Sequence, residues 1–491
     1  MKRKDGLCNM RDDYEVIIGL EVHAELATKS KIYCSCSTEF GADPNTHVCP
    51  ICTGMPGVLP VLNEKVVEYA VKMGLATNCK IAGFSKQDRK NYFYPDLPKA
   101  YQTSQYDLPL CYEGHVDFMV GDTKKTVGIT RIHIEEDAGK LIHDPYTGDT
   151  LVDLNRCGVP LIEIVSEPDI RSKEEAIGYM QTLKSILEYL EICDCKMQEG
   201  SLRCDVNLSV RKKGETKFGT RTETKNLNSF KAIGRSIDFE IDRQIKELEN
   251  GGKIYQETRR WDDDKGIGYA MRTKEDAHDY RYFPEPDLAP IVLSEEYVEK
   301  LRDNLPEMPN VRRDRYMTEL GLPEYDATLI TNSKHMAEFF DNAVKKCSNP
   351  KLVSNWMLSD MSRLMNEKEM EVTDLKFTPE DLGDLILLID KGTISSAIAK
   401  KVFEKMFETG EKPAVIVEKE GLVQITDEGA IKEMVISVIN ENPKSVEDFL
   451  NGKDKAVGFI VGQVMKASRG KANPGTVNKL IMEELNKRKN G

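Results

Sequence analysis

The stretch that carries Glu21 and His23 has the clearest potential for chemistry. Apolar residues occupy the even positions from 16 to 26, so the pattern predicts a strand with Glu21 and His23 on its other face. Alternate residues of a strand are about 7 Å apart, so both side chains can reach one cation. The solvated outer face of a strand has the same pattern, and the sequence leaves that alternative open.

Three successive carboxylates, Glu135, Glu136 and Asp137, follow a second alternating stretch over residues 130–134. Neighbouring carboxylates repel one another unless a cation or basic groups compensate their charge. The run therefore indicates a cation site, although a surface turn solvated by water would also accommodate it.

A third alternating stretch, residues 199–210, places Ser201, Arg203 and Asp205 on one face and apolar side chains on the other. A strand with such a polar face, lying beside similar strands, predicts a concave polar site. Residues 220–226, which include Lys225 and Asn226, can supply more of that site.

Two close pairs of cysteines, Cys34 with Cys36 and Cys49 with Cys52, are separated by twelve residues. Four thiolates in this spacing, with glycine and proline nearby, are typical of a closed tetrahedral zinc site. We predict a structural Zn²⁺, because four thiolate ligands leave no open position for catalysis. Reduced thiols without a metal are the alternative.

Residues 88–101 interleave basic residues, including Lys90 and Lys99, with tyrosine and phenylalanine. Loops of this kind stack nucleic-acid bases and hold phosphates. A proline-rich structural loop is an equally good interpretation of the same residues.

Composition excludes several classes of protein. The chain has 491 residues, of which 40% are hydrophobic and 31% charged, with a net charge of −13, which is typical of a globular protein of about three domains. Twelve cysteines are too few for a disulfide scaffold. The longest uncharged run, residues 44–63, contains four prolines, so we expect no membrane helix and a cytoplasmic location.

Two further features of the sequence bear on its function. The sequence contains no phosphate-binding P-loop motif and no recognisable nucleophile motif, so we do not expect this chain to open an amide by itself. From residue 453 onward the net charge is +6, nine basic minus three acidic residues, which indicates a nucleic-acid contact or a solvated basic helix.

The elements that position these residues change in type along the chain. Strand-like alternation dominates residues 14–295 and is interrupted by helical patterns near residues 173–190 and 229–250. Helical patterns follow, including one that begins with a cap at Thr378, and the Lys412–Pro413 pair resembles a linker. We predict an α+β fold with a β-rich cradle domain (14–295), a helical domain (296–411) and a small helical tail domain (412–491).

Several of these motifs together resemble the B subunits of the aspartyl/glutamyl-tRNA amidotransferases, and the similarity extends from about residue 14 to residue 488. The tail resembles the YqeY-like tRNA-contacting module. The motifs that carry the resemblance are residues 18–23, 88–101, 135–140, 154–156, 162–169, 199–205, 225–230 and 279–285.

The resemblance implies a heterotrimer with a glutaminase (amidase) subunit plus a small third subunit. Such a complex converts misacylated tRNA, Glu-tRNA(Gln) or Asp-tRNA(Asn), to the amidated form. Members of this family use ATP to phosphorylate the side-chain carboxylate, and ammonia that arrives through a tunnel from the glutaminase displaces the phosphate.

The resemblance also implies roles for individual residues. It assigns Mg²⁺ binding to Glu21, His23, Glu135, Glu136 and Asp205, and it places Lys90, Lys99 and Glu136 where the ammonia tunnel opens. We assign ATP binding to Ser201, Arg203, Lys225 and Asn226. The four cysteines, Cys34, Cys36, Cys49 and Cys52, match the zinc knuckle that some members of the family carry.

Other functions fit the sequence less well. A zinc-containing tRNA-binding adaptor without its own chemistry would not need three polar strand faces. A metal-dependent hydrolase would need a nucleophile or an open zinc site. The archaeal-type paralogue carries a large extra domain, for which 491 residues leave no room.

Overall fold

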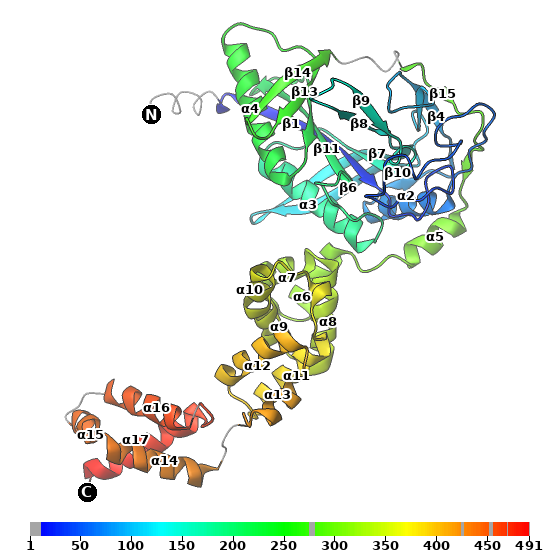
Figure 1. Ribbon diagram of the computed structural model, residues 1–491. Coiled ribbons are helices and arrows are strands. Elements are labelled where there is room, and N and C mark those ends of the chain that lie inside the picture. The colour runs from blue at the N-terminus through cyan, green and yellow to red at the C-terminus, as the bar shows by residue number, and fades with distance from the viewer. Residues whose placement is uncertain (1–10, 274–279, 424–426, 451–454, 469, 491) are drawn as a thin grey trace. The chain divides into compact units, whose positions relative to one another are not determined.

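The computed structural model describes residues 11–273, 280–423, 427–450, 455–468 and 470–490, and the chain divides into two compact units, Met1–Pro309 and Asn310–Gly491 (Figure 1). Among the residues counted above in the basic C-terminal segment, Lys453, Asp454 and Arg469 lie outside the described residues, as does Asp279 of the last motif. Within the described residues no helix is long and apolar enough to cross a membrane.

Nine strands form the main sheet of the first unit, in the order β14-β13-β12-β11-β1-β10-β7-β6-β2. The paired strands are antiparallel except for β12 and β13, which are parallel. The strands are β1 (Tyr14–Glu25), β2 (Lys80–Ile81), β6 (Cys111–Val120), β7 (Thr123–Glu136), β10 (Pro160–Ser166), β11 (Leu202–Lys212), β12 (Thr222–Leu227), β13 (Glu257–Asp262) and β14 (Ile267–Thr273).

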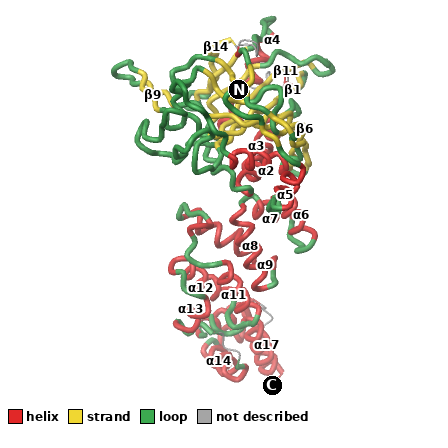
Figure 2. The backbone as a smooth tube through the Cα atoms, turned by 90° about the vertical axis from the view of Figure 1, so that its right-hand side faces the viewer, coloured by secondary structure: helices red, strands yellow, loops and turns green. Residues whose placement is uncertain are grey.

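Three smaller sheets belong to the same unit. Strands β4 (Asp88–Asn91), β5 (Tyr101–Ser104) and β15 (Phe283–Pro284) form one, and β3 (Phe84–Ser85) pairs with β16 (Ile291–Val292). Strands β8 (Lys140–His143) and β9 (Thr150–Asp153) form a hairpin that projects from the body of the unit (Figure 2).

Helices α2 (Glu64–Ala76), α3 (Lys173–Tyr189) and α4 (Phe230–Glu249) pack against one face of the main sheet, and α5 (Glu295–Asp303) packs on α2 (Figure 1). The sequence predicts α3 and α4 but not α2. Helices α3 and α4 begin at serine caps, since Ser172 accepts a hydrogen bond from the Glu175 amide and Ser229 accepts one from the Ala232 amide.

The predicted faces of β1 are confirmed. Ile18, Leu20, Val22 and Ala24 lie in the hydrophobic core between the sheet and the helices. Because side chains alternate along a strand, the acidic residues and His23 lie on the opposite face of the sheet. That face carries the candidate site.

The second unit is helical. Its helices are α6 (Pro309–Thr318), α7 (Glu324–Thr331), α8 (Lys334–Cys347), α9 (Pro350–Trp356), the π-helical turn Met357–Met361, α10 (Ser362–Glu367), the 3₁₀ turn Val372–Asp374, α11 (Pro379–Asp390), α12 (Ser396–Thr409), α13 (Pro413–Lys419), α14 (Glu428–Glu441), α15 (Pro443–Leu450), α16 (Lys455–Ala467) and α17 (Pro474–Asn490). The α+β class predicted from the sequence is confirmed.

Local signals are correct at one point of this unit and wrong at another. Thr378 and Asp381 form the reciprocal capping box of α11. The Lys412–Pro413 pair is not a linker, because Lys412 is the N-cap residue of α13 and Pro413 is its first residue. Proline is favoured at that first position, since an amide hydrogen there would have no partner in the helix. The last four helices enclose a hydrophobic cluster of their own, built around Ile431, Ile460 and Ile481.

Candidate active site

Strand register brings the candidate residues together on the exposed face of the main sheet. His23 on β1 lies opposite Arg203 on β11 and opposite Glu163 on β10, and Glu163 in turn lies opposite His133 on β7. Glu21 lies opposite Asp205. Residues from four adjacent strands thus form one polar surface about Glu21 and His23.

One acidic cluster consists of Glu21, Asp205 and Glu223, whose ligand atoms all lie within 4.8 Å of one another. Lys225 contacts Asp205, and its Nζ lies 3.3 Å from Oε1 of Glu223. Burial alone would lower the pKa of Lys225, but these two carboxylates outweigh it and raise the pKa. Without a bound metal ion, Lys225 supplies the positive charge that offsets the repulsion among the carboxylates of Glu21, Asp205 and Glu223.

A second cluster consists of His23, Glu135 and Glu163, again within 4.8 Å. His23 Nε2 lies 3.6 Å from Glu135 and 3.5 Å from Glu163, and His133 Nε2 lies 3.6 Å and 3.3 Å from the same carboxylates. Burial would lower the pKa of His133, but Glu163 and then Glu135 raise it to about 9. Burial would raise the pKa of Glu163, yet His133 and His23 hold it well below the usual value.

Both clusters fit divalent cations. Carboxylate oxygens are the ligands that Mg²⁺ prefers, and an imidazole beside two carboxylates also suits Mn²⁺. Oδ1 of Asn207 is buried without a hydrogen-bond partner in the described structure, while its Nδ2 donates to Glu21 (2.9 Å). This unpaired amide oxygen of Asn207, beside the first cluster, is suited to be an additional oxygen ligand of a cation bound there.

The two clusters lie in the wall of one cavity of about 830 Å³. Of the residues assigned above to metal or ATP, Arg203, Lys225 and Asn226 also line this cavity, and so does Lys90. Ser201 does not line it. The Ser201 hydroxyl instead contacts Asp194 and accepts a hydrogen bond from the Lys196 amide, which fixes the turn before β11.

A polar network holds Arg203 in place. Its Nη1 lies 2.8 Å from Oδ2 of Asp137, and Arg156 lies 3.6 Å from the same oxygen. Burial would raise the pKa of Asp137, but the two arginines lower it to about 2. Burial, and then the Asp137 carboxylate, raise the pKa of the neighbouring Glu25 to about 8. Asp137 is therefore the anchor of an arginine that faces the cavity.

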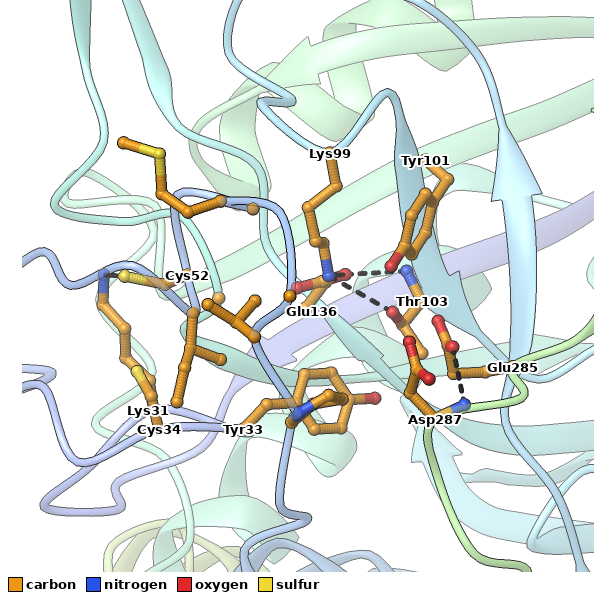
Figure 3. Close-up of a pocket in the computed structure, with 17 residues that line it drawn as sticks. Lys31, Tyr33, Cys34, Cys52, Lys99, Tyr101, Thr103, Glu136, Glu285 and Asp287 are labelled. Carbon is orange, nitrogen blue, oxygen red and sulfur yellow. Dashed lines mark hydrogen bonds and ion pairs between the residues drawn. The ribbon is translucent and has the colours of Figure 1, made fainter.

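Glu136 is separated from both clusters. It points to the other side of β7 from Glu135, into a smaller pocket of about 180 Å³, where it pairs with Lys99 and accepts a hydrogen bond from the Thr103 amide (2.8 Å) (Figure 3). Lys99 also donates to the Thr103 hydroxyl (3.3 Å). The structure thus divides the three residues predicted at a tunnel opening between two pockets, with Lys90 in the large one and Lys99 and Glu136 in the small one.

The four cysteines come together as predicted, with their sulfur atoms within 4.8 Å of one another. A bridge between Ser30 and Ser37 closes the loop that carries Cys34 and Cys36, and the Cys49 amide donates to the sulfur of Cys52 (3.2 Å). A hydrogen bond from Cys34, helped by the Cys49 amide and Lys31, lowers the pKa of Cys52 to about 4. Four close sulfurs with one already acidic form a site that can bind a soft metal ion.

Lys31 is the buried cation of this site and is 0% exposed. Its Nζ donates to the carbonyl oxygens of His47 (2.7 Å) and Leu154 (3.4 Å) and lies 3.6 Å from Sγ of Cys52. No carboxylate in the described part of the chain forms an ion pair with it. The sulfur of Cys52, whose pKa is lowered, is therefore the negative charge that lies beside this ammonium.

Sequence analysis assigned no individual role to Glu163, Glu223 or His133, although all three lie in stretches that it singled out. A charged residue between apolar neighbours, as Glu163 lies between Ile162 and Ile164, is a signal that could have identified the first. The separation of Glu135 from Glu136 was also predictable, because adjacent residues of a strand face opposite sides.

Comparison with known families covers most of the chain. The GatB/GatE catalytic domain family matches residues 16–299, which include both acidic clusters and the cysteine cluster, and a second family described as the GatB domain matches residues 338–485.

Three relatives match nearly the whole chain. A protein of Caldicellulosiruptor bescii is 63% identical over 478 residues, 97% of this chain and 100% of its own length. One of Thermoanaerobacter pseudethanolicus is 62% identical over 474 residues, 96% of this chain and 100% of its own length. One of Carboxydothermus hydrogenoformans is 56% identical over 478 residues, 97% of this chain and 99% of its own length. All three are named as the B subunit of aspartyl/glutamyl-tRNA(Asn/Gln) amidotransferase.

Proposed function

Since this chain belongs to the GatB/GatE family, as its sequence motifs predict, we propose that it is the B subunit of a glutamine-dependent tRNA amidotransferase. Its substrates are the misacylated Glu-tRNA(Gln) or Asp-tRNA(Asn). The chain phosphorylates the side-chain carboxylate with ATP, and ammonia then displaces the phosphate.

One observation carries the proposal. Two clusters of metal-ligating side chains lie next to each other in one cavity, and β7 separates that cavity from a pocket built around the Lys99–Glu136 pair. A carboxylate is a poor electrophile until it is phosphorylated, so the reaction needs a site for phosphoryl transfer with a route for a nucleophile beside it.

The first cluster, Glu21, Asp205 and Glu223, would bind Mg²⁺, and His23, Glu135 and Glu163 would bind a second divalent cation. Such ions, when bound, neutralise charge on the transferred phosphoryl group and on the carboxylate that attacks it. With a cation as counter-charge for Asp205 and Glu223, Lys225 would be available to bind the phosphates of ATP. Arg203 and Asn226 complete the phosphate-binding surface.

Ammonia enters from the smaller pocket. The Lys99 ammonium pairs with the Glu136 carboxylate, and a carboxylate at this point can accept a proton from the attacking nitrogen. Lys90, on the cavity side, stabilises negative charge at the carbonyl under attack. The glutaminase subunit, together with the small third subunit, supplies the ammonia.

Two regions act away from the chemistry. The four cysteines bind a structural Zn²⁺, since a site of four thiolates has no position open for a substrate. The basic C-terminal helices bind the tRNA backbone, because phosphate contacts dominate the affinity of proteins for nucleic acid.

The test is amidation by the reconstituted complex. Purified chain, the glutaminase, the small third subunit, misacylated tRNA, ATP and glutamine should give amidated aminoacyl-tRNA with release of ADP. His23→Ala should abolish ADP release and amidation, whereas His143→Ala, an exposed histidine on β8, should alter neither. Ammonium chloride bypasses the glutaminase but not the phosphorylation, so it should not rescue His23→Ala. Full amidation by His23→Ala would show that the strand face carrying Glu21 and His23 is only solvated. No ATP-dependent amidation by the wild-type complex would refute the proposed function and favour an adaptor that only binds tRNA.

A further inference from the structure

One end of the large cavity carries a group of aromatic side chains that the proposed chemistry does not use. We call this group the aromatic wall: Tyr92, Phe93, Tyr94, Tyr106, Tyr280 and Tyr282. Tyr106 and Tyr282 stack in parallel, with ring centroids 4.4 Å apart and an interplanar angle of 10°. Tyr280 contacts both Tyr92 (6.0 Å) and Tyr282 (6.1 Å) edge to face.

These rings do not form part of the hydrophobic core. Phe93 is 78% exposed, Tyr106 51% and Tyr94 49%, although all three line a cavity with an acidic floor. Lys90 lies among them, 4.9 Å from the centroid of Tyr280 and 6.0 Å from that of Tyr92. Exposed rings beside a cation are suited to a planar group that is attached to an anion.

The opposite end of the cavity is basic. Lys225 on β12 and Arg260 on β13 are paired in register, and Arg221 lies just before β12. Arg221 and Arg260 are exposed and form no ion pair within the described ranges. Four strand spacings of about 4.8 Å separate β12 from β7, so the two ends are about 19 Å apart. One small ligand does not fill both.

The aromatic wall lies at the β7 end. Strand β5, which precedes Tyr106, is joined to β7 by hydrogen bonds from Gln102 to the Glu136 carbonyl (2.8 Å) and from the Thr103 amide to the Glu136 carboxylate (2.8 Å). The Ser104 hydroxyl reaches Glu135 (3.3 Å). Ammonia from the Glu136 pocket therefore meets the cavity beside this wall.

This order fixes the orientation of the substrates. The carbon that ammonia attacks belongs to the aminoacyl group, so that group lies at the β7 end. In every aminoacyl-tRNA it is esterified to the terminal adenosine. We propose that the aromatic wall stacks the adenine of this terminal adenosine, and that ATP enters from the basic β12–β13 end. The inference rests on the proposed function and specifies which end of its site takes which substrate.

The test uses the assembled complex and two uncharged acceptor-stem RNAs, one ending in CCA and one ending in CC. Stacking of one base on an aromatic side chain should make the CCA-ended RNA bind roughly tenfold more tightly. Tyr106→Leu should remove this preference, and Tyr106→Phe should keep it because the ring remains. Tyr146→Leu is the matched control, since Tyr146 is 96% exposed on the β8–β9 hairpin and outside the cavity.

ATP provides the second measurement. Tyr106→Leu should leave the KM for ATP unchanged while raising the KM for aminoacyl-tRNA, and Arg260→Gln should do the reverse. If Tyr106→Leu raises the KM for ATP and keeps the preference for CCA, the wall binds the adenine of ATP and the inference is wrong. An unchanged preference in folded Tyr106→Leu, or none in the wild type, also overturns it. These results differ from failure of the proposed function, in which the wild-type complex gives no ATP-dependent amidation at all.

Discussion

Replacing Lys31 with methionine tests how the cysteine cluster is stabilised. Zinc bound by four thiolates would carry a net charge of −2, and the buried Lys31 ammonium would halve it. Methionine fills a similar volume without the charge. It leaves the Cys52 sulfur without its cation and removes the hydrogen bonds to the carbonyl oxygens of His47 and Leu154.

The structure gives the magnitude. Removing an outer-shell partner of a metal ligand usually lowers metal affinity 10- to 100-fold, which is about 1.4 to 2.7 kcal/mol. The His47 carbonyl oxygen loses its donor, which costs about 1 to 3 kcal/mol of stability with or without metal, whereas the Leu154 oxygen keeps the hydrogen bond from the Cys157 amide (3.0 Å). Lys31→Met should therefore show two separate losses, one in metal affinity and one in the stability of the apoprotein.

Competition with a chromogenic chelator measures the first loss, and denaturant unfolding of zinc-loaded and zinc-free protein measures the second. Lys29→Met is the matched control, because Lys29 is exposed two residues away. Cys49→Ser, which removes a ligand, sets the limit of complete metal loss. A folded Lys31→Met protein with zinc affinity within twofold of wild type would refute the reasoning. So would equal destabilisation of the loaded and zinc-free forms, because Lys31 would then serve the carbonyls alone.

Three other perturbations follow from the geometry. Glu136→Gln should still release ADP in the presence of misacylated tRNA but should fail to amidate it with either glutamine or ammonium chloride. The measurement is the ratio of amidated tRNA to ADP. Loss of ADP release as well would place Glu136 with the metal ligands instead. Arg89→Met should destabilise the protein by about 3 kcal/mol at pH 7, because Glu285 would stay buried without the guanidinium that binds both its oxygens at 2.7 Å. Burial would raise the pKa of Glu285, but Arg89 lowers it. The stabilisation by this pair is therefore present above the unfolded pKa near 4.5 and is lost as the pH falls through the folded pKa. Denaturant unfolding at pH 7 and pH 4 should show the stabilities of wild type and variant converging in acid, and a constant difference would contradict the assignment. Truncation after Gly421, which keeps α13 packed on α11 and α12, should weaken tRNA binding and flatten its salt dependence, and an unchanged salt slope would assign the tail to protein contacts.

Local pattern was enough to predict much of this protein. The alternation in residues 14–26 identifies a strand and its two faces, because the side-chain period of a strand is two whatever it pairs with. The spacing of the four cysteines likewise predicts their cluster, since a short loop brings close pairs together. Thr378 and Asp381 predict the start of α11, because a capping box involves one turn of chain.

Strand order, by contrast, is a property of the folded sheet, and it determined how the site residues are grouped. Glu21 and His23 are two residues apart, yet each belongs to a different cluster, because Asp205 and Glu223 lie on one side of β1 and Glu163 and Glu135 lie on the other. Pairings between residues about 110 to 200 positions apart leave no local signal, because they arise when the sheet buries its apolar face. The sequence by itself therefore determined which residue types face away from the core and that Glu135 and Glu136 face opposite sides of one strand. The tertiary structure decided which of these residues share a metal-ligating cluster and which share a pocket.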